Sequence, residues 1–590
     1  MLCRQGACRL YAGVTAANSS SPTTATAAIA ATKPATEPAT EPTTEPAPEP
    51  AGFWSRPPSA PIGGAWRVAI VGSGPAGFYT ADALLKGSKD VRVDIFDRLP
   101  APFGLVRYGV APDHPEVKNV TERFTGIAAS PRVRFAGNVR VGDGTASTVT
   151  VEELRGHYDA LVLACGAEGD RRLNLPGEEL RGVSSAREFV AWYNGHPDFA
   201  RERWDLSRGE TAVIVGQGNV ALDVARVLAK RASDIAPTDI TCAAVAALEA
   251  SQIRRVFVVG RRGPLQAAFT TKECRELSAL EGVRVRVELG EGALDALSES
   301  ALEALKDDRP RRRAAELLRK LWLANGDGSG VQPLPSGERE VVLAFHLSPL
   351  RFEAAPAEGG AAGGAEGGEL GCAVFERTRV EGGRAVGTGE HVRLPCGYVF
   401  RSVGYVAFAL PGVPFDPKLS RVPSAHGRVL HSAEEGALSL PGLYCAGWFK
   451  RGPSGVILTN IADAAETASA VLADHAASTL PSPEGSAEGL NCGLDGEGPD
   501  SLPALFATRG ISPVGFEGWA RIDAHERKAG AEAGKRLAKV VALDEMLWLA
   551  AQTGSSNELL YELFDYLLPC ARGLRKSSPI RYPPPSSPFS

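Results

Sequence analysis

The chain has 590 residues, 23% of them charged, and a formal net charge of −5 at pH 7. This even balance argues against a nucleic-acid-binding protein, so any basic docking surface must be local. The chain is too long to fold around one ordinary hydrophobic core and could form up to about four domains of usual size. Large α/β domains reduce the expected number to two. No apolar run reaches the roughly 18 residues of a transmembrane helix, so we expect no membrane span, and peripheral membrane association stays open.

The first 64 residues show no pattern that could pack into a core. Arg4, Arg9 and Lys33 precede the first acidic residue, Glu37, and a tract rich in Pro, Glu and Thr follows. The acid-poor start is typical of an organelle transit peptide, and the tract is typical of a disordered linker. The leader does not separate mitochondrion from plastid, and an untargeted tail is the alternative. We expect folded sequence to begin near Trp66.

The next segment has the pattern of a β-α-β unit. An apolar strand over Arg67–Val71 leads into the turn Gly72–Gly77, a helix over Phe78–Leu85 and a second strand over Val91–Phe96. The apolar run Tyr158–Ala164 is interpreted as the last strand of this first nucleotide domain. A glycine turn between strand and helix is typical of a dinucleotide site.

Each glycine of this turn has a separate physical role. Gly72 allows the tight bend, Gly74 lets the backbone approach a pyrophosphate, and Gly77 lets the helix pack close to the sheet. Asp97, at the end of the second strand, would accept hydrogen bonds from a ribose and repel a 2′-phosphate, which favours FAD or NAD. Alternatively, the glycine turn only joins the strand to the helix, and Asp97 is a solvated acidic residue at the end of a strand.

A second copy of the unit follows. It comprises a strand over Thr211–Val215, the turn Gly216–Ala221, a helix over Ala221–Lys230 and, after an insertion, a strand over Arg254–Val259. Two dinucleotides bound by one chain are therefore expected.

The second turn differs from the first in charge. Ala221 replaces the third glycine, and Arg261 and Arg262 stand where a ribose-binding carboxylate would otherwise be. The planar fork of arginine matches phosphate oxygens, so this site favours NADP over NAD. The alternative is an exposed basic strand end.

The cysteines give no sign of a metal centre or a redox disulfide. No two are separated by only two residues, as a zinc, iron-sulfur or dithiol site would usually require. Thiols in a reducing compartment are expected. The ten cysteines are Cys3, Cys8, Cys165, Cys242, Cys274, Cys372, Cys396, Cys445, Cys492 and Cys570.

Some runs are longer and more specific than a generic nucleotide turn. They are Gly72–Ala81, Pro102–Pro115, Gly216–Arg226, Val259–Gln266 and Gly447–Ile457. Together they resemble the adrenodoxin reductase family of mitochondrial NADPH:ferredoxin oxidoreductases. The likeness extends from about Trp66 to Met546, and the Gly/Ala-rich loop near residue 360 and the last forty or so residues lie outside it.

The resemblance implies an α/β fold with two Rossmann-like dinucleotide-binding domains. An NADP-binding domain over residues 171–405 would be inserted into an FAD-binding domain formed by residues 65–170 and 406–546, with a poorly ordered tail over 547–590. The implied reaction is hydride transfer from NADPH to FAD, followed by single-electron transfers to an acidic [2Fe-2S] ferredoxin. The resemblance further implies a monomer in the mitochondrial matrix, with no nucleic acid as partner.

The resemblance also implies which residues bind the cofactors. Asp97 departs from the family, which usually has the longer Glu at this position, so its ribose contact would be longer or water-mediated. With the turn glycines Gly72, Gly74 and Gly77, the residues implied for FAD are Ala76, Asp97, Leu105, Val141, Trp448, Gly455, Val456 and Ile457. Those implied for NADP are Gln217, Gly218, Asn219, Val220, Arg261, Arg262, Glu273 and Gly455.

Three further features bear on the chemistry. A helix expected over Ile457–Leu472 would direct its N-terminal dipole at the reduced flavin, and Trp448 would pack beside the ring unless it is an ordinary core residue. Asp113 and His114 are candidates to buffer the proton balance of flavin reduction. A structural hydrogen-bonded pair is the equal alternative, and no side-chain nucleophile is expected.

A basic cluster is the candidate docking surface. Arg309 to Arg313 contains four arginines, and Arg275 lies on the helix after the NADP strand. The resemblance assigns Arg275, Arg309 and Arg313 to ferredoxin binding, which electrostatic attraction would support. The alternative is an ordinary solvated helix face.

Three other functions share the nucleotide turns. A pyridine-nucleotide disulfide reductase needs a close cysteine pair, which this sequence lacks. A flavin monooxygenase would couple NADPH use to oxygenation without ferredoxin. A non-catalytic sensor or scaffold would bind FAD without reducing it.

Overall fold

The computed structural model describes residues 66–290, 297–325, 334–335, 337–356, 368–481 and 493–552. All of them belong to one unit, Pro57–Ser590. The predicted transit peptide and linker over 1–64 lie outside the described residues, as does most of the predicted tail. Within the described ranges, no helix is long and apolar enough to cross a membrane.

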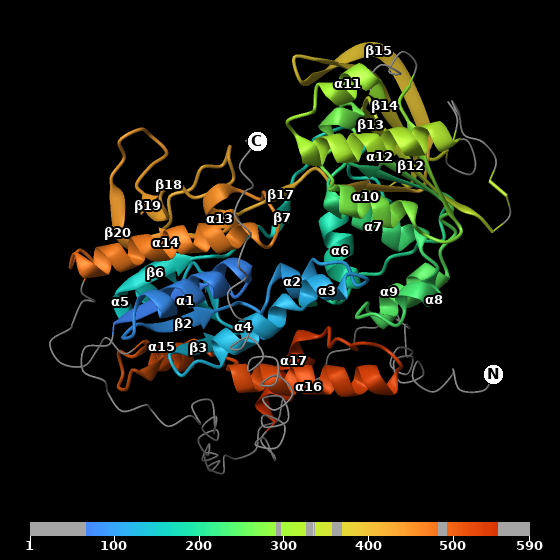
Figure 1. The fold of residues 1–590 in the computed structure, drawn as a ribbon. Coiled ribbons are helices and arrows are strands. Elements are labelled where there is room, and N and C mark those ends of the chain that lie inside the picture. The colour runs from blue at the N-terminus through green and yellow to red at the C-terminus, as the bar shows by residue number, and fades with distance from the viewer. Residues whose placement is uncertain are drawn as a thin grey trace, which may run out of the picture. The chain divides into compact units, whose positions relative to one another are not determined.

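A seven-stranded sheet forms what we call the first lobe (Figure 1). Its order is β18-β19-β20-β6-β1-β2-β3, and the strands from β20 to β3 are parallel. The strands are β1 Arg67–Val71, β2 Arg92–Phe96, β3 Val133–Ala136, β6 Ala160–Leu163, β18 Ser424–Ala425, β19 Arg428–Leu430 and β20 Ser439–Cys445.

The central strands of this sheet match the sequence expectations. The predictions of a strand over Arg67–Val71 and of a strand ending at Phe96 are confirmed. The prediction that Tyr158–Ala164 is the last strand is wrong, because β20 pairs in parallel with β6. Such a pairing of segments far apart in sequence depends on tertiary packing.

A six-stranded parallel sheet forms the second lobe. Its order is β11-β12-β10-β9-β16-β8. Since all its strands lie between β6 and β18 in the chain, the second lobe is inserted into the first, and the predicted fold class is confirmed. The strands are β8 Val183–Ser185, β9 Thr211–Val215, β10 Arg255–Val259, β11 Val283–Glu288, β12 Arg339–Ala344 and β16 Tyr398–Arg401.

The chain crosses between the lobes at two paired strands. β7, Gly169–Asp170, lies antiparallel to β17, Tyr405–Val406. The two connections are therefore held side by side, close to the positions expected for the domain boundaries.

Helices cover both faces of the first sheet because its strands are apolar on both sides. Val68 and Ile70 face a core shared with α1 Pro75–Gly87 and α14 Thr459–Ala476, which pack together. Ala69 and Val71 face a core shared with α5 Val151–His157 and α15 Leu502–Thr508. Further elements of this lobe are α2 Leu105–Tyr108, α3 Pro115–Lys118, α4 Val120–Ala128, α13 Trp448–Arg451, and the short strands β4 Arg140–Gly142 and β5 Thr148–Thr150.

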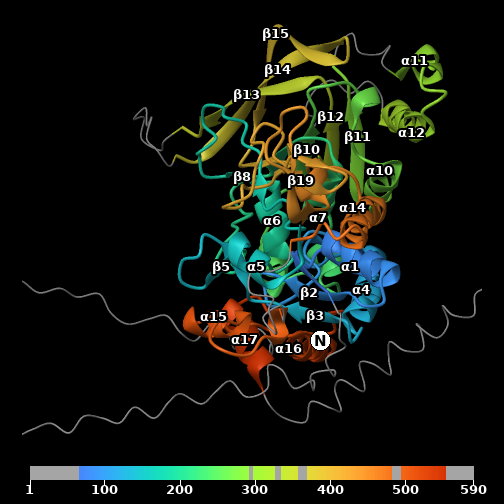
Figure 2. The same cartoon turned by 90° about the vertical axis from the view of Figure 1, so that its left-hand side faces the viewer.

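The second sheet has helices on one face and a small sheet on the other. Ile214 and Val258 face a core with α6 Ala186–Tyr193, α7 Asn219–Ala229 and α12 Arg309–Asn325. The opposite face packs against the antiparallel strands β13 Leu347–Ala354, β14 Leu370–Glu381 and β15 Arg384–Pro395, which Figure 2 shows together. The other helices are α8 Ala232–Ile235, α9 Cys242–Glu249, α10 Thr271–Ser278 and α11 Glu299–Glu303.

The C-terminal helices belong to the first lobe. α16, Phe516–Glu532, packs against α17, Leu543–Ala551, and lies beside β3. Met546, Leu549 and Ala550 are buried in the core of the first sheet. The expected start of the tail at residue 547 therefore falls within a packed helix.

Candidate cofactor-binding sites

The first glycine of the turn after β1 has no room for a side chain. Gly72 has φ +110°, and its amide donates to the Phe96 carbonyl at 2.7 Å. An ideal Cβ at Gly72 would lie 2.4 Å from the Ala164 carbonyl oxygen. Gly77 is equally constrained, because its Cβ would lie 2.0 Å from the Gly72 oxygen. The backbone therefore requires both glycines.

Gly74 is different, because its Cα faces open space. An ideal Cβ at Gly74 would have no described heavy atom within 4 Å. Pro75 begins α1, so the first free amides of the helix follow directly. Open backbone at a helix N-terminus is the geometry that holds a pyrophosphate. The arrangement fits the phosphate-binding role expected of this turn.

Asp97 follows β2 and contacts the same turn. Its Oδ2 accepts hydrogen bonds from the Ser73 amide at 2.9 Å and the Ser73 hydroxyl at 2.5 Å, and its Oδ1 accepts one from the Leu99 amide at 3.0 Å. Burial raises the pKa of Asp97, although these hydrogen bonds oppose the change. A carboxylate oxygen accepts about two hydrogen bonds, so the side chain retains capacity for a ribose hydroxyl.

The second turn repeats the geometry of the first. Gly216 has φ +129°, and an ideal Cβ there would lie 2.1 Å from the Ser402 carbonyl oxygen. A Cβ at Gly218, like one at Gly74, would meet no described heavy atom within 4 Å. Gln217 Nε2 donates to the Ala344 carbonyl at 2.9 Å, and Asn219 Oδ1 accepts from the Thr270 amide at 2.8 Å. These contacts fix the turn against β12 and α10.

Arg261 and Arg262 follow β10 and are exposed. Neither forms an ion pair with a described residue, so both guanidinium groups are available to an anion. Their backbone is nevertheless fixed. The Arg261 carbonyl accepts a hydrogen bond from the Thr378 hydroxyl at 2.7 Å, and the Arg262 carbonyl accepts one from the His346 amide at 3.2 Å.

Apolar surface is exposed around α13 and the segment that joins it to α14. Trp448 is half-buried, its Nε1 donates to the Ser454 carbonyl at 3.0 Å, and its ring centroid lies 5.3 Å from that of Tyr405. Gly455 has φ +83°, and Val456 is 56% exposed. α14 begins at Thr459, two residues later than the sequence predicted. Leu105 and Val141, the other expected flavin residues, are also only partly buried.

Asp113 is held by ion pairs between the lobes. Arg226 Nε lies 2.8 Å from its Oδ2, and Lys230 Nζ lies 2.5 Å from the same oxygen. Burial alone would raise the pKa of Asp113, but Arg226 and Lys230 outweigh burial and hold the pKa well below its ordinary value. These contacts favour a structural role for Asp113, and its proton-buffering role stays a prediction.

His114 makes a different contact from the one expected. Its Nε2 lies 2.8 Å from Glu276 Oε2 and 3.8 Å from Glu273 Oε2. Ligand atoms of His114, Asp223 and Glu273 lie within 4.8 Å of one another. Burial is the main cause that raises the pKa of Glu273.

Sequence reasoning did not select Asp223, Arg226, Lys230 or Glu276 individually. Arg226 ends one of the specific runs, and an arginine on the buried face of an amphipathic helix was the available signal. Its pairing with Asp113 is not visible in the sequence because Asp113 belongs to the other lobe.

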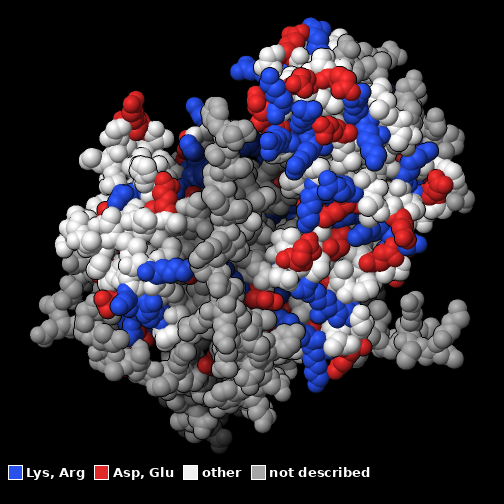
Figure 3. Space-filling model, in the orientation of Figure 1, with Lys and Arg blue, Asp and Glu red and all other residues white. Residues whose placement is uncertain are grey.

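The expected docking residues lie on neighbouring helices. Arg275 is on α10, Arg309 and Arg313 are on α12, and the two helices pack together. All three side chains are exposed and form no ion pair with a described residue. Figure 3 shows Lys and Arg side chains gathered over the part of the surface where Figure 1 places these helices.

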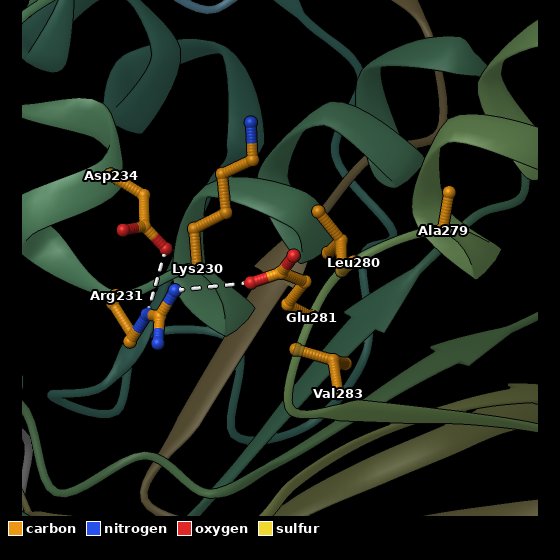
Figure 4. A pocket seen from close by; sticks show the side chains of 7 residues that line it. All are labelled: Lys230, Arg231, Asp234, Ala279, Leu280, Glu281 and Val283. Atoms are coloured by element: carbon orange, nitrogen blue, oxygen red, sulfur yellow. Dashed lines mark hydrogen bonds and ion pairs between the residues drawn. The ribbon is translucent and has the colours of Figure 1, made fainter.

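A surface hollow of about 310 Å³ lies at the C-terminal end of α7 (Figure 4). Arg231, on its wall, pairs with Asp234 at 2.9 Å and Glu281 at 3.6 Å. The glycine turn is at the opposite end of α7, so the hollow is not the nucleotide site. Its lining residues are Lys230, Arg231, Asp234, Ala279, Leu280, Glu281 and Val283.

Comparisons with known proteins place the chain in a family. Residues 66–317 match the family model described as pyridine nucleotide-disulphide oxidoreductase. The mitochondrial NADPH:adrenodoxin oxidoreductase of Salvelinus fontinalis is 45% identical over 505 residues, which are 84% of this chain and 92% of that protein. The Arabidopsis thaliana protein of the same name is 42% identical and covers 82% of this chain and 95% of its own length. The chain belongs to the NADPH:adrenodoxin oxidoreductase family.

A solved structure gives the same result for the fold. The Mycobacterium tuberculosis protein FprA in complex with NADPH is 37% identical, with a TM-score of 0.70, over 82% of this chain and 100% of that one. Adrenodoxin oxidoreductases are FAD- and NADPH-dependent oxidoreductases.

The six described cysteines of this family member are free thiols: Cys165, Cys242, Cys274, Cys372, Cys396 and Cys445.

Proposed function

We propose that this protein transfers electrons from NADPH, through a bound FAD, to an acidic [2Fe-2S] ferredoxin. The observation that carries the proposal is the pairing of two open glycine turns with opposite charge. Asp97 contacts the first turn, whereas Arg261 and Arg262 extend from the strand beside the second. One turn suits a ribose with free hydroxyls, and the other suits a 2′-phosphate.

The first turn would hold FAD. Gly72 and Gly77 shape the bend, and the open backbone at Gly74 would receive the pyrophosphate at the start of α1. Ala76, in the first turn of α1, is proposed to contribute to the same site. Asp97 would bind the ribose. The exposed apolar surface around Val456 supports a flavin there, because a bound ring would remove that surface from water. The remaining flavin contacts proposed are Leu105, Val141, Trp448, Gly455 and Ile457.

The second turn would hold NADPH. Gln217 and Asn219 fix the turn, and the open backbone at Gly218 would receive the pyrophosphate. Val220, in the first turn of α7, is proposed to contribute to the same site. Exposed Arg261 and Arg262 would bind the 2′-phosphate. Glu273 and Gly455 are proposed to complete the site.

When bound, FAD accepts a hydride from NADPH and releases electrons singly, which the side chains of a protein cannot do. The protein contributes position and electrostatic field. Gly455, which has φ +83° and no side chain, would leave room for nicotinamide and flavin to approach each other. The N-terminus of α14, close behind it, would place a positive dipole toward added negative charge.

The basic surface of α10 and α12 would bind ferredoxin. Arg275, Arg309 and Arg313 are exposed and unpaired with described residues, so docking would break no ion pair within the part of the chain that the structure describes. Complementary charge would accelerate association at low salt.

The protein is proposed to be a monomer of the mitochondrial matrix, with FAD-binding residues 65–170 and 406–546 and NADP-binding residues 171–405. Several relatives are named mitochondrial, which supports this location. A fluorescent fusion of residues 1–64 should enter mitochondria, and entry into plastids would contradict the assignment.

The function is tested by adding NADPH to the purified yellow protein without oxygen and then assaying cytochrome c reduction with and without a [2Fe-2S] ferredoxin. We expect the flavin to bleach within the mixing time of a manual assay and cytochrome c reduction to require ferredoxin. A flavin that stays oxidised would refute the electron-transfer function. Bleaching coupled to substrate oxygenation would indicate a monooxygenase.

A further inference from the structure

One lysine near the C-terminus contacts both lobes at once. The Lys539 ammonium donates to the Arg107 carbonyl and to the Asn194 carbonyl, each at 3.0 Å. It also lies 3.0 Å from Asp239 Oδ2. The Lys539 side chain is 1% exposed, so these contacts replace water entirely.

The contacts of Lys539 come from elements that carry the two nucleotide turns. Arg107 is in α2, directly after Gly104, where an ideal Cβ would lie 3.2 Å from the Gly74 Cα. Asn194 caps the C-terminus of α6, which packs against α7, the helix of the second turn. A single ammonium group thus links the surroundings of the flavin turn to those of the NADP turn.

A second lysine strengthens the same junction. Lys118 Nζ donates to Asp239 Oδ1 at 2.8 Å and to Oδ2 at 2.7 Å, so one buried carboxylate holds two ammonium groups. Burial alone would raise the pKa of Asp239, but Lys539 and Lys118 outweigh burial and lower the pKa to about 2. The two lysines thus favour the charged form of Asp239. Burial lowers the pKa of Lys539 in turn, although Asp239 opposes that change.

The backbone next to Lys539 is also held. Glu526 of α16 accepts a hydrogen bond from the Val540 amide at 2.9 Å, and its carboxylate pairs with Arg107 at 2.5 and 2.9 Å. α16 therefore holds both the segment that carries Lys539 and the helix that Lys539 contacts. Because each partner is buried, displacement of Lys539 would leave two carbonyls without a donor.

We propose that Lys539 is a positioning residue for hydride transfer, which fixes α2 of the first lobe against α6 and Asp239 of the second. The proposal rests on the proposed NADPH-to-FAD reaction. Hydride transfer requires the two reacting atoms within about 3 to 3.5 Å, and a misplacement of about 1 Å can cost on the order of a hundredfold in rate. Nothing in the geometry makes Lys539 a group that exchanges protons with a substrate.

The test is Lys539→Met, which keeps the aliphatic stem and removes the ammonium. We expect flavin reduction at saturating NADPH, measured by stopped flow per bound flavin, to slow by roughly 10- to 100-fold. The primary isotope effect with 4-deuterated NADPH should increase, because hydride transfer limits the rate. Reduction of the same flavin by dithionite should be unchanged, since it needs no alignment with nicotinamide.

Lys535→Met is the matched control. Lys535 lies in the same segment, but its ammonium donates to the Ile240 carbonyl at 2.5 Å and contacts the second lobe alone. We expect wild-type flavin reduction from this variant. Hydrogen exchange gives a readout independent of activity: amides of Leu105–Tyr108 and Asn194 should exchange faster in Lys539→Met and not in Lys535→Met.

A flavin reduced by saturating NADPH at the wild-type rate in Lys539→Met would overturn the proposal, even if the variant were less stable. If Lys539→Met does not fold, Asp239→Asn decides the question, because it removes the carboxylate that attracts Lys539 and should slow the same step. Failure of the proposed function is distinguishable, since NADPH would then not reduce the flavin of the wild-type protein.

Discussion

Arg226 and Asp113 form a two-pronged ion pair between the lobes, with Nε 2.8 Å from Oδ2 and Nη2 3.0 Å from Oδ1. Their side chains are 2% and 7% exposed. Arg226 belongs to α7, and Asp113 precedes α3. Two residues from different sequence motifs thus form one buried ion pair. The arrangement of the lobes therefore depends on charge pairing.

Replacement of Asp113 by Asn should destabilise the protein, because Arg226 and Lys230 would lose a shared buried carboxylate. We expect the free energy of unfolding to fall by about 3 to 5 kcal/mol, measured by urea denaturation. Arg231→Ala, which breaks the exposed pair with Asp234, is the control and should have little effect. Equal effects of both substitutions would contradict the assignment of a buried structural pair.

The two glycine turns predict opposite results for alanine at neighbouring positions. Gly72→Ala should unfold the turn, because φ is +110° and the methyl group would strike the Ala164 carbonyl. Gly74→Ala should leave the thermal stability of the FAD-free protein unchanged and weaken FAD binding on the order of a hundredfold, because its methyl group would occupy the space for the pyrophosphate.

Gly126→Ala is the control for both substitutions. Gly126 lies exposed in α4, and a Cβ there meets no described atom within 4 Å. This variant should bind FAD normally and gain roughly 0.5 to 1 kcal/mol of stability. Normal FAD affinity in Gly74→Ala, measured by titration of the apoprotein, would be evidence against a phosphate at this turn.

Replacement of Arg261 and Arg262 by Ala should change cofactor preference. The KM for NADPH should rise on the order of a hundredfold while that for NADH stays nearly constant, because only NADPH carries the 2′-phosphate. Steady-state kinetics with both nucleotides measure the ratio. An equal rise in KM for NADPH and NADH would mean that the arginines support the fold of the turn rather than bind the 2′-phosphate.

Reduction through ferredoxin should slow as salt rises, because exposed charges on α10 and α12 are screened over about 8 to 10 Å at physiological ionic strength. Arg313→Glu should slow it further at low salt, with flavin reduction by NADPH unaffected. Arg384→Glu, an exposed change at the start of β15, is the control. A turnover rate independent of salt would exclude this surface as the docking site.

Glu153 predicts an acid-sensitive contribution to stability. It closes the capping box of α5 and accepts a hydrogen bond from Arg509 Nη1 at 2.8 Å. Hydrogen bonding by Arg509, against a smaller opposing effect of burial, lowers the pKa of Glu153 to about 2. The pKa of glutamate in an unfolded chain is about 4.3. The contribution of charged Glu153 to the free energy of unfolding is therefore complete above the unfolded pKa and is lost as the pH falls through the folded pKa of about 2.

Glu153→Gln should lower the free energy of unfolding by on the order of 1 kcal/mol at pH 7, since water screens a pair this close to the surface. The difference from wild type should shrink steadily between pH 4 and pH 2, as measured by urea unfolding. Glu152→Gln, with an 83% exposed side chain, is the control. A difference independent of pH would show that the charge of Glu153 does not contribute.

Local features were predictable because their cause is local. The glycines of both turns, the strand Arg67–Val71 and the strand Thr211–Val215 follow from patterns of a few residues, and the structure confirms them. The opposite charges of Asp97 and Arg261 follow in the same way, because each residue simply ends the strand next to its turn. The helix α14 was also predictable, although its start was not, since Ile457 and Leu458 form a turn before the helix begins at Thr459.

Contacts between segments that are distant in the chain could be learned only from the tertiary structure. The pairing of β20 with β6 joins two segments of the first lobe that are separated in the chain by the whole second lobe. The contact of Arg226 with Asp113 and those of Lys539 with the second lobe join residues from different lobes. No periodicity in the sequence records such contacts, because they depend on how distant segments pack in three dimensions. The sequence by itself determined which nucleotides this protein suits, and only the packing of its lobes decided how charge holds the two sites together.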